Sequence, residues 1–189
     1  MVLQIVKFGE PVLRKKGARI EKITPEVEKL IEDMLETMYA NKGVGLAAQQ
    51  VGVSSQLTVI DVRGVTDRPS TLEIDGQAVN PAEHMPLILL NPEITPVGKT
   101  VAGPEGCLSF PEIFADISRP EDVEVKAQNA KGKDIKFRAG GLLSRAVQHE
   151  FDHLQGILFI DRMDKQTKEE LRPEFEALQE STRRATQKK

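Results

Sequence analysis

The chain has 189 residues, of which 29 are acidic and 26 basic, giving a formal net charge of −3. This length is typical of a single domain with enough chain to bury a core. The slightly negative charge excludes a nucleic-acid-binding protein whose whole surface is basic, and no apolar run approaches the roughly 20 residues of a membrane span. We therefore expect neither a DNA partner nor a membrane partner.

Cys107 is the single cysteine, which excludes an internal disulfide and leaves the thiol free for chemistry or for burial. The N-terminal segment MVLQIVKFGEPVLRKKGARI lacks the basic region, apolar region and small-residue cleavage site of a secretory signal peptide. These features predict a cytoplasmic protein, or an organellar matrix protein if a transit peptide has been removed.

The first clear helix begins at Thr24 and Pro25, because threonine suits the N-cap and proline the first turn. Apolar residues then recur with the spacing of one helix face, and acidic residues take the other side. The apolar positions are Val27, Leu30, Ile31, Met34, Leu35 and Met38. The sequence thus predicts an amphipathic helix that ends near residues 41–43.

Two short apolar runs, residues 57–62 and 87–90, are rich in residues that favour strands. The polar stretch between them, residues 63–85, is predicted to be a surface insertion, because loops tolerate added length. A functional or mobile connection is the alternative for a stretch this long. Residues 123–127 and 134–138 alternate in polarity on either side of a turn, which predicts an antiparallel hairpin.

A second helix is predicted from Gly140 and Gly141 to Gly156. Residues 165–179 favour a helix interrupted by Pro173, and the polar, basic end is expected to be frayed. The predicted fold class is α+β, with mostly antiparallel strands packed around one central helix.

The second predicted helix carries His149-Glu150-Phe151-Asp152-His153, the H-E-x-x-H pattern. Two imidazoles four residues apart lie on one helix face and can bind one metal ion. The helical projection turns both histidines toward the interior and places Glu150 at the flank. Polar residues occupy the opposite side: Arg145, Gln148, Asp152 and Gln155. A pair of core histidines held only by hydrogen bonds is the alternative interpretation.

A catalytic metal usually has three protein ligands and one open position. Cys107 is a candidate for the third, because it lies in a segment with a neighbouring glycine, although a lone cysteine is also a common small core residue. His84, in the polar insertion, is expected to be solvated. No histidine or glutamate stands at the downstream position that a metzincin peptidase would use.

Three segments, in this order, resemble the signature of one family, peptide deformylase: Gly43-Val-Gly-Leu-Ala-Ala-Gln-Gln50, Glu105-Gly-Cys-Leu-Ser109 and His149-Glu-Phe-Asp-His-Leu-Gln-Gly156. The opening Phe8-Gly-Glu-Pro-Val-Leu-Arg14 is also similar to the family. The resemblance extends over a catalytic domain of residues 1–163, and residues 164–189 form an additional helix and basic tail. It implies an α+β fold, removal of the formyl group from the initiator methionine, and a preference for Fe²⁺ over Zn²⁺ or Ni²⁺.

The same resemblance implies a role for each matching residue. Cys107, His149 and His153 would bind the metal, and Glu150 would be the general base. The side-chain amide of Gln50 and the backbone N–H of Leu108 would stabilise the oxyanion.

Substrate residues are predicted from the glycines and from the apolar side chains near the metal-binding helix. Glycine lets backbone approach an extended ligand, so residues 43–46 and 105–107 are expected to lie beside the substrate peptide. Arg119 matches a basic position common in the family. The predicted substrate-binding residues are Val44, Gly45, Gly106, Leu142, Ala146 and Arg119.

The expected partners are N-formylmethionyl peptides and the ribosome near the exit of the nascent chain. Two other interpretations stay open on sequence alone. A zinc peptidase of the H-E-x-x-H type would cleave internal peptide bonds. A non-enzymatic metal-binding or ribosome-associated module would use the basic tail, which contains Arg183, Arg184, Lys188 and Lys189.

Overall fold

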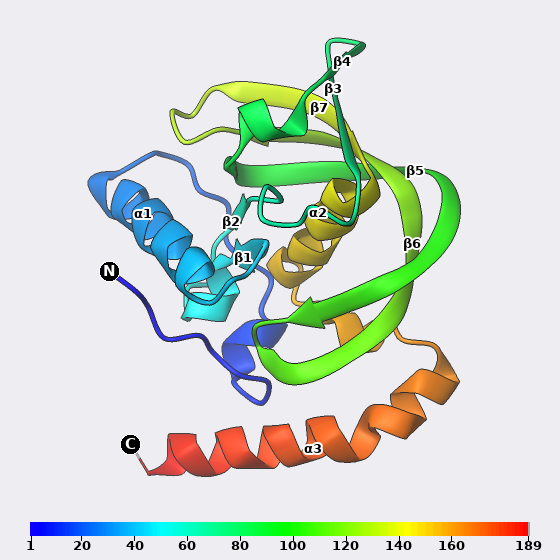
Figure 1. Cartoon of the computed structure of the whole chain (residues 1–189). Coiled ribbons are helices and arrows are strands. Elements are labelled where there is room, and N and C mark those ends of the chain that lie inside the picture. Colours follow the sequence, from blue (N-terminus) through cyan, green and yellow to red (C-terminus); the bar gives the residue numbers. More distant parts are fainter. Residues whose placement is uncertain (189) are drawn as a thin grey trace.

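The computed structural model describes residues 1–188. Within them, seven antiparallel strands form one sheet in the order β1-β2-β5-β6-β7-β3-β4. The strands are β1 Gly45–Ala47, β2 Leu57–Ile60, β3 Ser70–Ile74, β4 Gln77–Val79, β5 Leu87–Cys107, β6 Phe110–Gln128 and β7 Asp134–Gly140. The helices are α1 Pro25–Ala40, α2 Gly141–Leu154 and α3 Lys165–Gln187 (Figure 1). The predicted α+β class is confirmed.

Helix α1 has the start and the buried face that the sequence predicts. The side chain of Thr24 caps it by accepting a hydrogen bond from the backbone N–H of Val27 at 3.3 Å. Its buried residues Ile31, Met34 and Met38 pack in one apolar cluster with strands β1 and β2. This packing holds β1 at the edge of the sheet and close to α2 (Figure 1).

Strands β5 and β6 form a long ribbon that extends far beyond the two short strands predicted in this region. Figure 1 shows the ribbon curving around α2 toward the end of the molecule where α3 lies. The pairing of β5 with β6 shifts register near Leu90, Val97 and Gly106. Register shifts of this kind are typical of β-bulges, which let a strand bend and accommodate proline. The curvature brings Glu105 and Cys107, at the end of β5, to the surface of α2.

The prediction that residues 63–85 are only a surface insertion is wrong in part, because this stretch contains strands β3 and β4. They form a hairpin that turns at Asp75 and Gly76, both with positive φ. Strand β3 pairs with β7, and Leu72 is buried in the core beside α2. The hairpin therefore completes one edge of the sheet.

Helix α2 is buried on nearly every side, although the sequence shows polar residues opposite the two histidines. Arg145, Gln148 and Asp152 are each less than a tenth exposed. They remain buried because each finds a polar partner, such as Glu105 for Arg145 and Arg119 for Asp152. Helix α2 is therefore central, as predicted, and is surrounded by polar as well as apolar contacts.

Helix α3 continues through Pro173 to Gln187, so the predicted interruption and the predicted fraying of residues 181–187 are both wrong. Pro173 is exposed, and water can hydrogen-bond the carbonyl that loses its helical partner. The helix is anchored where Phe175 meets Phe8 and where the Thr186 hydroxyl donates to Glu10 at 2.7 Å. Lys189 lies outside the described residues. Among residues 1–188, no helix combines the length and the hydropathy needed to cross a membrane.

Candidate metal centre

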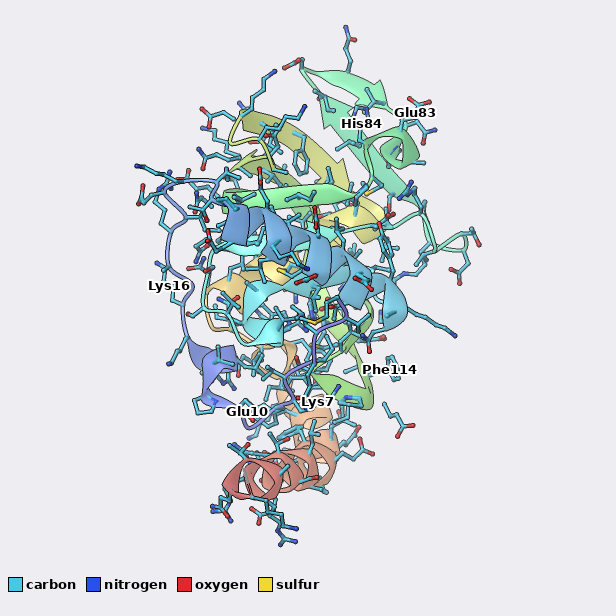
Figure 2. All side chains as sticks on the ribbon, turned by 90° about the vertical axis from the view of Figure 1, so that its left-hand side faces the viewer. Lys7, Glu10, Lys16, Glu83, His84 and Phe114 are labelled. Atoms are coloured by element: carbon cyan, nitrogen blue, oxygen red, sulfur yellow. The ribbon has the colours of Figure 1, made fainter. Side chains whose placement is uncertain are left out.

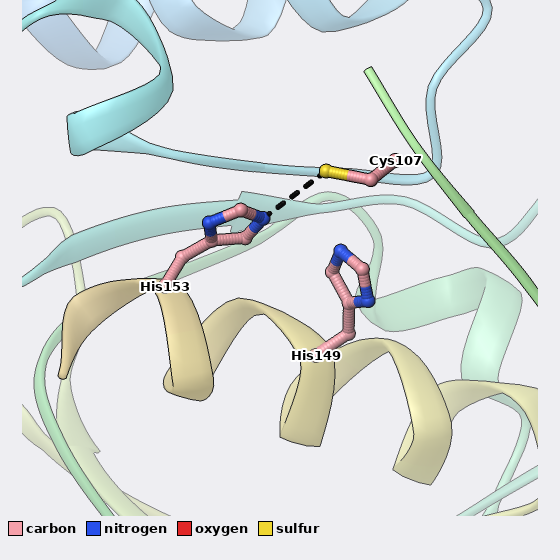
Figure 3. Close-up of side chains that lie close together, drawn as sticks. All are labelled: Cys107, His149 and His153. Atoms are coloured by element: carbon pink, nitrogen blue, oxygen red, sulfur yellow. Dashed lines mark hydrogen bonds between the residues drawn. The ribbon is translucent and has the colours of Figure 1, made fainter. Parts of the chain in front are cut away.

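The side chains of Cys107, at the end of β5, and of His149 and His153, on α2, converge on one another (Figure 3). One ligand atom from each lies within 4.8 Å of the others, and Cys107 Sγ is 3.3 Å from His153 Nε2. The ring centroids of His149 and His153 are 5.0 Å apart on one face of α2, as expected for residues four positions apart on a helix. Sulfur and two imidazole nitrogens are a ligand set that transition metals accept.

A buried carboxylate fixes the orientation of His149. Glu105 Oε1 lies 2.8 Å from His149 Nδ1. Burial opposes ionisation of Glu105, but hydrogen bonds from His149 and Arg119 lower its pKa to about 2. Because the ionised carboxylate can only accept, Nδ1 must be the donor, and Nε2 is left to face Cys107.

The two histidines differ in their readiness to lose a proton. Burial lowers the pKa of His149, but hydrogen bonds with Cys107 and Glu105 outweigh it and raise that pKa well above the ordinary value. Burial and the neighbouring cations His149 and Arg119 lower the pKa of His153. Metal ligation requires neutral imidazoles, and the lowered pKa of His153 favours that form.

Glu150 follows His149 on α2 and is buried against β1. Burial raises the pKa of its carboxyl to about 7. Its Oε2 atom has no hydrogen-bond partner among residues 1–188, and a Cβ added to Gly45 would lie 2.4 Å from Oε1. A glycine is therefore needed beside this carboxyl group, which is poised to exchange a proton near neutral pH.

Gln50 places its side-chain amide next to the sulfur of Cys107. Its Oε1 accepts from the backbone N–H of Ala47 at 2.9 Å, so Nε2 points toward Cys107 Sγ at 3.5 Å and Ser109 Oγ at 3.3 Å. The neighbouring Gln49 instead donates to the carbonyls of Lys15 and Leu154. Gln50, rather than Gln49, therefore offers a donor to a ligand at this site.

Leu108 lies in the turn between β5 and β6, directly after Cys107. Its carbonyl oxygen accepts from Lys7 Nζ at 2.9 Å. The close approach of Gly43 to the side chain of Leu108 leaves no room for a Cβ, which would lie 2.9 Å from Leu108 Cδ1. These contacts hold the turn between the N-terminal segment and the loop before β1.

A cavity of about 520 Å³ is lined by two of the candidate ligands, Cys107 and His149, while His153 lies outside its lining. Its lining includes five of the predicted substrate residues, namely Val44, Gly45, Gly106, Leu142 and Ala146. It also includes four residues that the sequence analysis did not place at the substrate site, Lys7, Lys42, Arg68 and Phe114. These four belong to segments without a chemical motif, so only the folded chain brings them to the cavity.

Arg119 is absent from that lining, which corrects the prediction of a direct substrate contact. Its side chain is 4% exposed and donates to Glu105 at 2.6 Å and to Asp152 at 2.9 Å. The guanidinium of Arg119 therefore neutralises two buried carboxylates, Glu105 and Asp152, and does not line the cavity. Arg145 also donates to Glu105, at 2.9 Å, and does reach the cavity wall.

His84 is exposed, in agreement with the expectation of a solvated residue. It ends a short helical turn, Pro81–His84, and borders a separate hollow of about 1000 Å³ on the sheet. In Figure 2, His84 and Glu83 lie at the opposite end of the molecule from Lys7 and Phe114. His84 is therefore not part of the Cys107, His149 and His153 group.

Comparison with known proteins gives a consistent result over nearly the whole chain. The family model for polypeptide deformylase matches residues 2–169. A peptide deformylase of Methylacidiphilum infernorum is 47% identical over 178 residues, covering 94% of this chain and 93% of that protein.

Two solved structures agree with the sequence comparison. The crystal structure of the Thermotoga maritima peptide deformylase has a TM-score of 0.74 at 41% identity, covering 87% of this chain and 99% of that one. An Arabidopsis thaliana peptide deformylase in complex with an inhibitor has a TM-score of 0.83 at 35% identity, covering 97% of this chain and 94% of that one. The chain belongs to the peptide deformylase family.

Proposed function

We propose that Cys107, His149 and His153 bind the divalent metal with which this chain, as a peptide deformylase, removes the N-formyl group from nascent peptides. The convergence of the three donor atoms beside Glu150, beneath an open cavity, carries this proposal. The donors fit a metal because Glu105 orients His149 and because the lowered pKa of His153 favours the neutral imidazole that ligation requires. A bound metal would supply Lewis acidity toward the formyl oxygen and the attacking water.

Glu150 acts as the proton carrier of the reaction. It accepts a proton from water as the water oxygen bonds to the formyl carbon, and delivers it to the nitrogen as the carbon–nitrogen bond breaks. The products are formate and a free amine. A pKa of about 7 suits both halves of this transfer near neutral pH.

The negative charge that develops on the formyl oxygen requires donors already in place. Gln50 Nε2 is held by the contact of its own Oε1 with Ala47. The backbone N–H of Leu108 is the second proposed donor, in a turn fixed by Lys7.

Replacement of Gln50 with alanine tests the role of its amide. Loss of one oxyanion donor typically lowers turnover by about 10²–10³-fold. We expect this decrease in kcat for formate release, with metal content unchanged, because Gln50 is not among the three ligands. Gln49→Ala is the comparison variant for loss of a buried glutamine. Near-normal turnover of Gln50→Ala would exclude this role.

The methionine side chain is proposed to occupy the apolar part of the cavity. Val44, Leu142 and Ala146 supply apolar surface there, while Gly45 and Gly106 let backbone approach the substrate. Every proposed catalytic and substrate residue precedes residue 163. This supports a catalytic unit of residues 1–163 with residues 164–189 added to it.

We propose Fe²⁺ as the native metal, in keeping with the family resemblance, although affinity alone favours Zn²⁺. Anaerobic purification, metal analysis and reconstitution with Fe²⁺, Ni²⁺ or Zn²⁺ test this assignment. Formate release from formyl-Met-Ala, and no cleavage of an unformylated peptide, is the result expected of the best-reconstituted form. Cleavage of the unformylated peptide would instead indicate an ordinary zinc peptidase.

We propose a cytoplasmic location beside the ribosome, because the formylated N-terminus of the substrate emerges where the nascent chain leaves the ribosome. The end of α3 carries Arg183 and Arg184, but both pair with Glu180. Co-sedimentation with ribosomes, with and without residues 180–189, tests whether this end contributes to binding. We expect truncation to weaken co-sedimentation, and an unchanged amount of bound protein would exclude the tail as the contact.

A further inference from the structure

Three cations from distant parts of the chain line the same cavity. Lys7 comes from the N-terminal segment, Lys42 from the loop between α1 and β1, and Arg68 from the segment before β3. Lys42 is exposed, and Lys7 and Arg68 are half-buried. None of the three forms an ion pair with a carboxylate of residues 1–188. Lys7 donates to the carbonyl of Leu108, so Lys42 and Arg68 are the cations left available to a ligand.

The carboxylates of the cavity do not balance these cations. Glu105 is buried and already bonded to Arg119 and Arg145. Glu150 is buried at the floor. Glu112 is the one exposed carboxylate in the lining formed by the described residues. The mouth of the cavity is thus positively charged on a chain whose formal net charge is −3.

The substrate must pass this mouth. The reacting formyl group lies at the floor beside Glu150, so the residues that follow methionine extend outward toward solvent at about 3.3–3.6 Å per residue. Lys42 adjoins Gly43, and Arg68 adjoins Pro69, whose carbonyl accepts from the backbone N–H of Leu142 at 2.9 Å. The two cations therefore flank the segments that receive the substrate.

We propose that Lys42 and Arg68 make this enzyme selective for formylmethionyl peptides with acidic side chains directly after the methionine. The proposal rests on the function proposed above and adds a substrate class to it. Residues 63–85, which the sequence marks as an insertion, thereby gain a role, because Arg68 in the segment before β3 lines the cavity. Attraction between exposed charges also accelerates encounter with an acidic substrate.

Two peptides of equal size test the proposal: formyl-Met-Glu-Glu-Ala and formyl-Met-Gln-Gln-Ala, both with amidated C-termini. We expect the intact, metal-loaded enzyme to have a higher kcat/KM for the acidic peptide at low ionic strength, by about two- to fivefold for each cation engaged. The ratio should fall toward one near about 1 M salt, where screening shortens the Debye length to about 3 Å.

Charge-reversal variants identify the cations responsible. Lys42→Glu and Arg68→Glu should each lower the ratio of the two kcat/KM values, and the double variant should favour the neutral peptide. Lys16→Glu is the matched control, because it changes the net charge equally on an exposed lysine outside the cavity (Figure 2). The ratio within one variant does not depend on how much of the protein is folded.

The outcomes separate this proposal from the proposed function. Equal kcat/KM for the two peptides, or an equal ratio in Lys42→Glu, Arg68→Glu and Lys16→Glu, would overturn the selectivity for acidic substrates and leave deformylation intact. A lack of formate from both peptides would contradict the proposed function itself. A preference that survives at high salt would assign the selectivity to shape rather than charge, and would also overturn the proposal.

Discussion

Replacement of Glu150 with glutamine is expected to lower kcat for formate release by about 10²–10⁴-fold. Glutamine has nearly the same shape as glutamate and fits beside Gly45, but it cannot accept a proton from water. Because the three proposed ligands are unchanged, metal content should be the same as in the parent enzyme. Steady-state formate release and metal analysis on the same preparation measure the two quantities.

Glu83→Gln is the control for loss of a carboxylate, because Glu83 is exposed and lies far from the cavity (Figure 2). It should retain parental turnover. Full activity in Glu150→Gln would show that the proton moves through another group. Loss of metal from Glu150→Gln would show that this carboxyl supports the metal site rather than proton transfer.

Replacement of Arg119 with methionine is expected to decrease the free energy of unfolding by about 3–5 kcal/mol. Arg119 lies between Glu105 and Asp152, and all three side chains are at most 6% exposed. Methionine fills much of the space, but Glu105 is then left with Arg145 and Asp152 with the largely exposed Arg162, so two buried negative charges share less positive charge. Urea denaturation of the metal-free protein, followed by circular dichroism, measures the loss.

The same variant should also weaken metal binding. Glu105 orients His149, and loss of such a supporting group typically lowers metal affinity by about 10–100-fold. Arg138→Met is the matched control. Arg138 pairs with Asp122, and their side chains are 41% and 28% exposed, so this ion pair should contribute only about 0–1 kcal/mol to the free energy of unfolding. Similar stability losses in the two variants would contradict the distinction between a buried network and a surface pair.

The helices near the site could be predicted because their signals are local. The cap at Thr24 and the spacing of Met34 and Met38 lie within one element. In α2, the four-residue spacing of His149 and His153 fixes one shared face whatever the helix packs against. Long-range contacts decide the other side of α2, so the burial of Arg145 and Asp152 was not predictable from periodicity.

The ribbon illustrates what local patterns cannot show. Pro92, Pro96 and Pro104 interrupt any alternation along β5, yet register shifts against β6 accommodate the strand. Similarly, β3 and β4 are too short to stand out: β4 pairs with β3, and β3 joins the sheet by pairing with β7. Both elements owe their conformation to partners that lie far away in the sequence.

The residues of the candidate site were also predictable only in part from the sequence. The H-E-x-x-H spacing predicted His149, His153 and Glu150, and the resemblance to the family added Cys107 and Gln50. A motif position says nothing about burial, and Arg119 was therefore predicted at the substrate although it lies behind the ligands. Lys7, Lys42 and Arg68 belong to no motif, and only the closure of the fold makes them neighbours of one cavity.

The curved ribbon has one further consequence for the stability of the fold. Cys107 and His153 are 46 positions apart in the chain, and the segment between them contains β6 and β7. A metal ion held by both closes that segment into a loop, which restricts the unfolded chain as a covalent cross-link would. An ion bound by the proposed ligands would thereby also link the end of β5 to α2, so retention of the metal and persistence of the fold would depend on the same donor atoms.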